Sequence, residues 1–368
     1  MKTKRIYAAQ WLDAANANAQ ILNAKAMLSR FDQPNVQWIA PHYEAPDPLV
    51  AKRRNVQLRK LIHNGFWRAH LAVQYQSPVD AIFYPGGRWF DSWGLRIRRL
   101  MGRRVPVVAT LEGLVGDEDR QREYSQWAKH PVFCQAVDVK TLSRLDKLYR
   151  HADHIIAISP FLAEMGRRRY GDKFSVVPLG INDSIFFSPE QQQRAVRTRV
   201  VSAGNLKQGK RPDMFVELAK RHPEADFVWY GGHGSQELAI FQAKAEGFGN
   251  LSFPGNLQPL ELAEAFRSAD LFVMPSGSEG VPKVTQEAAA CGLPVVLFGY
   301  YEAPSVIDAK NGYVVWSEDQ FYDRVAELLA DVELRSRMGS QGAAMAQEWS
   351  WDVIALRWEA KILEVVNV

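Results

Sequence analysis

A glycine-containing loop at 203–211, AGNLKQGKR, follows an apolar run and leads into a helical pattern. The spacing of Gly204, Gly209 and Lys210 fits a phosphate-binding P-loop, whose backbone N–H groups and lysine hold phosphate oxygens. That motif needs a Ser or Thr hydroxyl for magnesium at the next position, where this chain has Arg211. No later strand ends in the magnesium-holding Asp of a nucleoside triphosphatase, so we do not expect that activity.

A second loop and helix at 274–296, MPSGSEGVPKVTQEAAACGLPVV, carries two carboxylates. Pro282 suits the first turn of a helix, and free N–H groups at a helix start attract a negatively charged group. Glu279 stands in the loop and Glu287 in the helix, where Lys283 lies four residues earlier on the same face. Either these carboxylates bind a ligand, or Glu279 caps the helix while Glu287 pairs with Lys283.

The chain around these loops alternates short apolar runs with amphipathic stretches, the rhythm of parallel β-α-β units. The runs are 5–11, 36–40, 80–85, 105–111, 154–159 and 174–179, and then 199–204, 226–232, 250–255, 270–276, 293–299 and 312–316. An irregular segment at 178–198 separates the two sets, and the chain is helical from about 318 onwards. We therefore predict an α/β protein with two Rossmann-like doubly wound parallel sheets, whose ligands bind beyond the carboxyl ends of the strands.

Composition is typical of a globular protein from a reducing compartment. Of 368 residues, 47% are apolar, and Cys134 and Cys291 are too few for a disulfide framework or a zinc site. No run reaches the ~18 apolar residues that span a bilayer. Asp13 and the amides that follow it interrupt the apolar stretch that a signal peptide needs. We expect a cytoplasmic protein.

Charge is divided unevenly along the chain. Residues 1–150 hold 24 Lys and Arg against 13 Asp and Glu, a net +11, whereas the remainder holds 21 against 28, a net −7. This asymmetry favours an anionic partner for the first part: lipid head groups, a phosphorylated acceptor or nucleic acid. Because no nucleic-acid-binding module accompanies the charge, we expect no nucleic acid.

The segment 86–104, GGRWFDSWGLRIRRLMGRR, combines aromatic and basic residues. Its apolar residues fall on one helical face, which is typical of a helix packed on a sheet. The alternative is that its arginines contact an anionic inner membrane, where lipid-linked acceptors reside. Further basic residues of the same part of the chain would join them: Arg53, Arg54, Arg59 and Lys60.

The 274–296 string resembles the signature of the retaining glycosyltransferases of family 4, in which two glutamates with seven residues between them flank a small-residue helix that leads to GxPVV. Segments 152–189 and 201–220 are similar to the end of the first domain and to the diphosphate loop in that family. The resemblance covers roughly 150–350, while the earlier part matches only in its rhythm. It implies the GT-B fold, two Rossmann-like domains with a cleft between them.

The resemblance also implies domain roles. Residues 1–180 would bind the acceptor and 181–350 the nucleotide sugar, and a final helix at 351–368 would return to the first domain. Lys210 would bind the diphosphate and help the leaving group depart, which suits a compact cation near developing phosphate charge. Asn205 stands where the family has an arginine. Either Lys207 or Arg211 supplies the missing charge, or the site is less positive than those of its relatives.

Further donor contacts follow from the same resemblance. Glu287 would bind the ribose hydroxyls and Glu279 the sugar, with the backbone of Gly280, Val281 and Lys283 nearby. The loop from Phe253 to Leu257 would read the base through its backbone. Gly231 and Gly232 end a strand, where they either let the backbone approach the ligand or simply form a turn.

In the first domain, many relatives have a histidine after the fourth strand, and Glu112 stands at about that point. Its carboxylate would orient an acceptor hydroxyl or stabilise positive charge on the sugar. The alternative is an anion buried at a helix start. The loop 16–20 would contact the acceptor through Asn18, Ala19 and Gln20, unless these residues only cap a helix.

The predicted reaction is transfer of a sugar, with retention, from a nucleoside-diphosphate sugar to a hydroxyl of a glycan or lipid-linked acceptor. Such an enzyme would work in surface polysaccharide or lipopolysaccharide synthesis, at the inner face of the membrane. We expect no cofactor and no metal, because none of the eight histidines forms a spaced ligand pair and the family that the sequence resembles usually works without metal ions. Two alternatives stay open: a nucleotide-sugar 2-epimerase of GT-B fold, and a non-catalytic protein that binds nucleotide sugars or carbohydrate.

Overall fold

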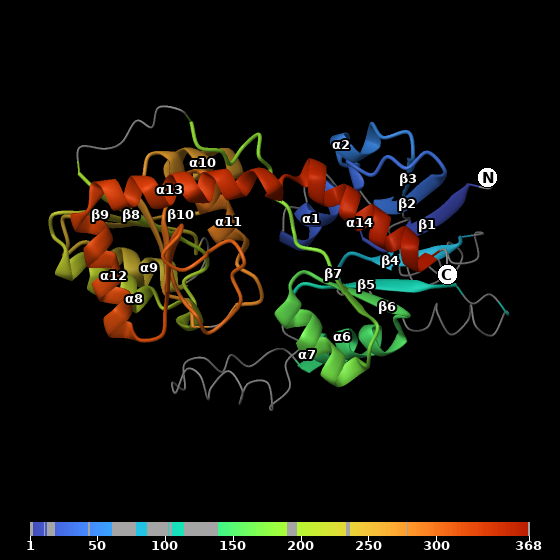
Figure 1. The fold of residues 1–368 in the computed structure, drawn as a ribbon, viewed down its shortest axis with the longest axis horizontal. Coiled ribbons are helices and arrows are strands. Elements are labelled where there is room, and N and C mark those ends of the chain that lie inside the picture. The colour runs from blue at the N-terminus through green and yellow to red at the C-terminus, as the bar shows by residue number, and fades with distance from the viewer. Residues whose placement is uncertain are drawn as a thin grey trace. The chain divides into compact units, whose positions relative to one another are not determined.

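The computed structural model describes residues 3–10, 12, 19–42, 45–60, 79–86, 102, 105–113, 139–189, 197–232, 236–277 and 279–366. These residues divide into two compact units (Figure 1). The first unit takes residues from the part before 113, from 139–180 and from 351–366, and the second takes those of 181–350. The chain therefore leaves the first unit after Gly180 and re-enters it at Trp351.

The described part of the first unit contains one parallel sheet with the strand order β3-β2-β1-β4-β5-β6-β7. Its strands are β1 Lys4–Ala8, β2 Val36–His42, β3 Val56–Lys60, β4 Ala81–Tyr84, β5 Val107–Leu111, β6 His154–Ala157 and β7 Phe174–Val176. The predicted runs account for every strand except β3. This strand lies at the sheet edge, where the polar sequence VQLRK lacks the apolar run of a central strand.

The helices in the described part of the first unit are α1 Ala19–Leu28, α2 Pro48–Ala51, α6 Val139–His151, α7 Pro160–Tyr170 and α14 Trp351–Val366. Hydrogen bonds hold the final helix, α14, to strand β2 and to loops of the same unit. The buried Glu359 carboxylate accepts hydrogen bonds from Trp38 Nε1 at 2.9 Å and from the backbone of Asp32 at 2.9 Å. Trp358 Nε1 donates to the Pro178 carbonyl at 2.8 Å. These bonds satisfy polar groups that burial would otherwise penalise.

The second unit contains a parallel sheet with the order β10-β9-β8-β11-β12-β13. Its strands are β8 Arg199–Ala203, β9 Asp226–Tyr230, β10 Leu251–Gly255, β11 Leu271–Met274, β12 Val295–Phe298 and β13 Gly312–Val315. All pair in parallel, so their carboxyl ends meet at one edge. The prediction of two doubly wound parallel sheets is confirmed.

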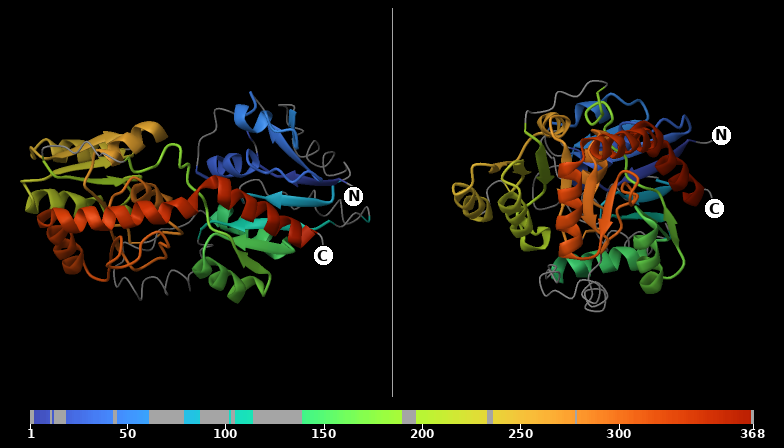
Figure 2. Two further views of the ribbon diagram at one scale, coloured as in Figure 1. Left: turned by 45° about the horizontal axis from the view of Figure 1, so that its top comes forward. Right: turned by 60° about the vertical axis from the view of Figure 1, so that its left-hand side comes forward.

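Helices cover both faces of this second sheet (Figure 2). Helices α8 Pro212–Arg221, α9 Gln236–Ala245 and α12 Glu318–Ala330 contribute to one core, in which the Phe215 ring lies edge-on to Phe227 and Trp229. Helices α10 Pro259–Arg267 and α11 Lys283–Ala290 contribute to the other. Helix α13 Val332–Ala346 then leads towards α14. No helix in the described ranges is long and apolar enough to cross a bilayer.

Candidate active site

The strand order of the second unit reverses between β8 and β11, which pair directly. The connections from these two strands run to opposite faces of the sheet, and such a point is where open α/β sheets bind ligands. The loop after β8 leads to the short 3₁₀ turn Gln208–Lys210, and the loop after β11 leads to α11. The Gly277 N–H donates to the Gly209 carbonyl at 2.9 Å, so the two loops are tied together.

The two loops bring Lys210 and Glu279 into contact. Lys210 Nζ donates to Glu279 Oε1 as an ion pair, with side-chain exposures of 22% and 15%. The lysine stem passes Gly204, where an added Cβ would lie 3.8 Å from Lys210 Cε. Helix α11 has no side-chain cap, so the interpretation of Glu279 as its cap is wrong. Pro282 precedes the helix in an extended conformation instead of forming its first turn, which corrects that prediction.

Arg211, one of the two cations that could compensate for Asn205, is paired with carboxylates of its own unit. Its side chain is buried and forms ion pairs with Asp213 at 3.1 Å and Glu318 at 2.9 Å. Burial opposes its charge, but the bonds to Glu318 and Asp213 outweigh that effect and raise the Arg211 pKa. Lys207, the other such cation, has an exposed side chain.

Asn205 itself has a local role in the loop. It is exposed, and its side-chain oxygen accepts a hydrogen bond from the Lys207 N–H at 3.4 Å. Such a contact is typical of asparagine in a turn. The amide group also leaves hydrogen-bonding capacity for a ligand, without adding positive charge.

Gly231 and Gly232 hold the end of β9 against the Gly204 loop. Both have positive φ angles, +126° and +81°. A Cβ on Gly231 would lie 2.1 Å from the Gly204 carbonyl oxygen, and one on Gly232 would lie 2.7 Å from Leu206 Cδ1. Close backbone packing therefore explains Gly231, whereas Gly232 makes room for the Leu206 side chain and adopts a positive φ angle.

Helix α11 presents the second glutamate. The partly exposed Glu287 lies one turn after Lys283, and burial raises the pKa of its carboxyl while the Lys283 charge offsets part of that effect. Thr285 Oγ1 bonds to the Pro282 carbonyl at 2.6 Å and to Ser305 Oγ at 2.8 Å. These bonds fix the start of the helix against the segment after β12.

The remaining donor candidates differ in their surroundings. Gly280 and Val281 are partly exposed between Glu279 and α11, as is Leu257, which follows β10. The Phe253 ring is buried against Phe215 and Phe241, and its carbonyl accepts a bond from Gln242 Nε2 at 2.9 Å. A contact with the base would therefore have to come from the backbone after Phe253.

Tyr301 is a residue near this site that sequence reasoning missed. It follows β12, its side chain is 7% exposed, and its hydroxyl has no hydrogen-bond partner among the described residues. Burial and the nearby charge of Glu279 raise its pKa well above the ordinary tyrosine value. Its position just beyond a strand end was the only signal in the sequence.

In the first unit, two amide side chains converge at the end of β4. A Cβ on Gly86 would lie 3.4 Å from Gln10 Oε1 and 3.5 Å from Gln20 Oε1. Gln20 is exposed in the first turn of α1, which begins at Ala19, and Gln10 is buried just after β1. Asn18 lies outside the described residues. Gln10 was absent from the predicted acceptor residues.

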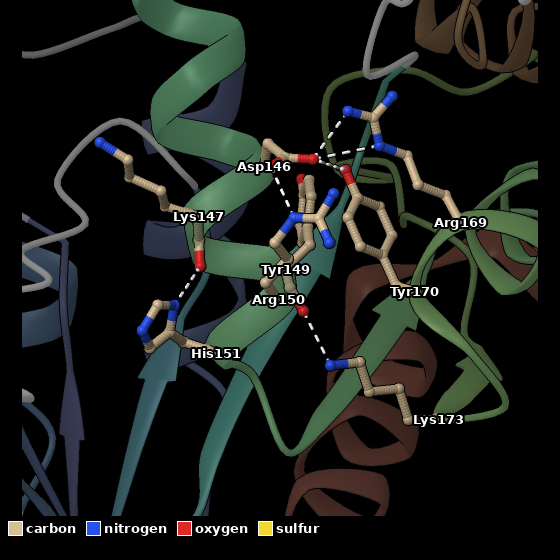
Figure 3. A network of polar contacts seen from close by, with 8 residues as sticks. All are labelled: Asp146, Lys147, Tyr149, Arg150, His151, Arg169, Tyr170 and Lys173. Atoms are coloured by element: carbon tan, nitrogen blue, oxygen red, sulfur yellow. Dashed lines mark hydrogen bonds and ion pairs between the residues drawn. The ribbon is translucent and has the colours of Figure 1, made fainter.

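Glu112 directly follows β5 and is partly exposed, as expected for a residue beyond a strand end. The same strand packs against α6. The Tyr149 hydroxyl donates to the Thr110 carbonyl at 3.1 Å. Lys173 Nζ donates to the Tyr149 carbonyl at 2.8 Å (Figure 3). The strand end before Glu112 is therefore held by side chains from neighbouring elements.

Asp146 joins α6 to α7. Its carboxylate accepts bonds from Arg150 at 2.8 Å, Arg169 at 2.8 Å and the Tyr170 hydroxyl at 3.2 Å (Figure 3). Burial opposes the charge, but the two arginines prevail and lower the Asp146 pKa. Two basic residues of this region, Arg150 and Arg169, are thus paired with a carboxylate inside the fold.

The segment 86–104 lies outside the described residues apart from its positions 86 and 102. Of the other basic residues, Arg53 donates to the Phe31 carbonyl at 3.3 Å and Arg54 is exposed. Arg59 and Lys60 end strand β3. Within the described ranges, no group of three or more His, Cys, Asp or Glu side chains is placed to hold a metal ion.

Two family models match consecutive parts of the chain: Glycosyltransferase Family 4 over residues 29–185 and Glycosyl transferases group 1 over residues 184–345. The chain belongs to the family 4, group 1 glycosyltransferases. The resemblance inferred from the 274–296 string is thereby confirmed, and the match also includes most of the first domain, where only the rhythm of strands and helices was similar.

Curated relatives and solved structures agree with this assignment. The chain is 25% identical over 291 residues to alpha-galactosylglucosyldiacylglycerol synthase of Streptococcus pneumoniae, covering 71% of each chain. It is 30% identical over 223 residues to D-inositol 3-phosphate glycosyltransferase of Paenarthrobacter aurescens, covering 54% of each chain. The glycosyltransferase thus spans about half the length of the second relative.

The solved structures support the GT-B fold. Sucrose-phosphate synthase of Thermosynechococcus elongatus superposes with a TM-score of 0.78 at 17% identity, covering 99% of both chains. HepE of Anabaena, solved in complex with UDP and glucose, superposes with a TM-score of 0.73 at 14% identity, covering 98% of this chain and 100% of that one. At these identities the likeness concerns the fold.

Proposed function

We propose that this glycosyltransferase binds a nucleoside-diphosphate sugar at the edge where β8 and β11 end, and transfers the sugar with retention to a hydroxyl of a glycan or lipid-linked acceptor. The observation that carries the proposal is the Lys210–Glu279 ion pair, which joins two glycine-containing loops at the point where the strand order reverses. A cation beside a sheet edge suits a diphosphate, and a carboxylate beside it suits sugar hydroxyls.

Lys210 acts on the leaving group in this proposal. Its ammonium turns from Glu279 to the diphosphate, where negative charge accumulates as the bond between the anomeric carbon of the sugar and the diphosphate oxygen breaks. Asn205 and the exposed Lys207 lie in the same loop and supply further hydrogen bonds. Arg211, held by Asp213 and Glu318, keeps the backbone of this loop in place.

The two glutamates divide the remaining donor contacts. Glu279 accepts hydrogen bonds from the sugar, close to the backbone of Gly280, Val281 and Lys283. Glu287 accepts them from the ribose hydroxyls, for which its carboxyl must be ionised. The loop ending at Leu257 contacts the base through its backbone, and Gly231 and Gly232 let that edge of the site close on the nucleotide.

The first unit receives the acceptor in this proposal. Gln20, Gln10 and Glu112 lie beyond strand ends and offer both hydrogen-bond donors and acceptors to a hydroxyl. The diacylglycerol and inositol-phosphate names of the relatives support an acceptor that is a glycolipid or a phosphorylated polyol. The net positive charge of residues 1–150 supports a site of action at the anionic inner face of a membrane. We place the reaction in surface polysaccharide or lipopolysaccharide assembly, with no metal required.

A thermal-shift panel of UDP, GDP, ADP and TDP with their common sugars tests the donor assignment. A ligand at ~100 times its dissociation constant adds about 2.7 kcal/mol to the free energy of unfolding, so one base should raise the melting temperature clearly. The complex of the structural neighbour with UDP makes UDP the first choice. Absence of stabilisation by every nucleotide would reject the site.

Retention and metal independence are tested on the product. NMR of the sugar anomeric proton should show the same configuration in donor and product. Activity should persist in a chelator that removes divalent cations. An inverted product or complete loss of activity with the chelator would contradict the corresponding part of the proposal.

A further inference from the structure

Tyr301 and Glu279 come from neighbouring strand ends. Strands β11 and β12 pair in register, with Met274 opposite Leu297. Glu279 lies in the loop after β11, and Tyr301 lies in the segment after β12. The carboxyl ends of adjacent parallel strands place the residues that follow them close together.

The Tyr301 hydroxyl is buried without a hydrogen-bond partner in the part of the chain that the structure describes. Its neighbour Tyr300 is different, because the Tyr300 hydroxyl donates to the Trp316 carbonyl at 2.9 Å. A buried O–H group that makes no hydrogen bond is unfavourable and uncommon in folded proteins. An unpaired hydroxyl that follows the strand next to the Glu279 loop indicates a partner that is gained in another state.

In the proposed function, Glu279 loses a hydrogen-bond partner when the donor binds. Its side chain is 15% exposed, and its carboxylate accepts a hydrogen bond from Lys210 Nζ. If the lysine ammonium turns to the diphosphate, the carboxylate loses its charged partner in a poorly solvated place. Other hydroxyls close by are already engaged: Thr285 and Ser305 bond to each other at 2.8 Å.

We propose that Tyr301 replaces Lys210 as the hydrogen-bond donor to Glu279 when the donor diphosphate binds, which makes Tyr301 a positioning residue for the sugar-binding carboxylate. The exchange rests on the proposed function of Lys210 and Glu279. It satisfies both groups at once, since the hydroxyl gains an acceptor as the carboxylate loses a cation. Tyr301 remains protonated throughout, because burial and the Glu279 charge both raise its pKa.

The test compares Tyr301→Phe with Tyr313→Phe as a matched control. Tyr313 lies on β13, where its hydroxyl donates to Glu327 at 3.0 Å. Tyr301→Phe should leave the melting temperature of the ligand-free protein unchanged or slightly raised, because it removes an unpaired hydroxyl. It should weaken binding of the stabilising nucleoside diphosphate about tenfold by titration calorimetry. Tyr313→Phe should lower the melting temperature and leave binding unchanged.

A double-mutant cycle with Glu279→Ala tests the coupling directly. In the Glu279→Ala protein, Tyr301→Phe should change nucleotide affinity by less than about twofold, since no side-chain oxygen remains at position 279 to accept the bond. An equal loss in both backgrounds would overturn the exchange of partners, as would a clear destabilisation of ligand-free Tyr301→Phe.

The two proposals fail in different ways. If wild-type protein binds none of UDP, GDP, ADP and TDP, the donor site and the inference both fall. If wild-type protein binds one of them and Tyr301→Phe binds it equally well, only the role of Tyr301 is rejected.

Discussion

The strand-end edges of the two units carry different chemistry. In the second unit, Lys210 and Glu279 form an ion pair between two loops that are tied together by their backbones. In the described part of the first unit, Gln10, Gln20 and Glu112 lie beyond strand ends, and two of the three are neutral amides. A fixed charge suits a diphosphate, whereas amides suit uncharged hydroxyls.

In the proposed function, one architecture serves two kinds of ligand through the side chains beyond its strands. Both sheets are parallel and doubly wound. The buried strands determine where the loops begin, and the loop residues determine what they bind. Four changes test this contrast, and they are ordered by expected size.

Replacing Lys210 by Ala should have the largest effect. Loss of the cation should lower kcat by about 10²–10³ and weaken nucleoside diphosphate binding, because the leaving group then lacks charge stabilisation. Steady-state kinetics and calorimetry measure the two effects. Lys220→Ala is the control, since Lys220 is an exposed lysine on α8 whose ion-pair distance to Glu217 is 3.9 Å. Equal activity in the two variants would contradict a donor role for Lys210.

Gly231→Ala should destabilise the second unit. The new Cβ would lie 2.1 Å from the Gly204 oxygen at a φ of +126°, so backbone must move and the free energy of unfolding should fall by about 2–4 kcal/mol. Urea unfolding measures the change. Gly249→Ala is the matched control, because no heavy atom lies within 4 Å of its added Cβ. Similar stability of both variants would show that the Gly204 loop moves away from the new Cβ at little cost in free energy of unfolding.

Nucleotide binding should depend on the ionisation of Glu287. Burial raises its carboxyl pKa, and Lys283 offsets this only in part. Because ribose hydroxyls require the carboxylate, affinity should be complete above the raised pKa and decline as the pH falls through it. In the ligand-free protein the sign is opposite: stability from this group decreases as pH rises from the ordinary to the raised pKa. Calorimetry across pH measures the affinity. If a Glu287→Gln variant keeps the same pH profile, the pH dependence of the affinity comes from another group.

Gln20→Ala should have the smallest effect, confined to the acceptor. Loss of one neutral hydrogen bond should raise the acceptor KM about fivefold and leave the nucleotide dissociation constant unchanged. Gln57→Ala, on the exposed side of β3, serves as the control. A change in nucleotide affinity instead would remove the distinction between the two edges.

Much of the fold follows from local sequence. Central parallel strands are buried on both faces, so runs such as 105–111 and 293–299 are almost wholly apolar and predict their strands well. The apolar-run pattern did not predict strand β3, because an edge strand needs no such run. Pro282 was placed one residue too far into its helix, since proline fits both the first turn and the residue before it.

The candidate site was only partly predictable. The sequence of this chain by itself determined two glycine-containing loops, their cation and their carboxylates, because spacing along a chain controls local geometry. Only the tertiary structure decided which charges meet. Lys210 and Glu279 are 69 residues apart yet form a pair, whereas Arg211, next to Lys210 in sequence, is committed to Asp213 and Glu318. Tyr301 is singled out only by its burial and by the effect of the Glu279 charge on it. Both depend on which strands become neighbours in space.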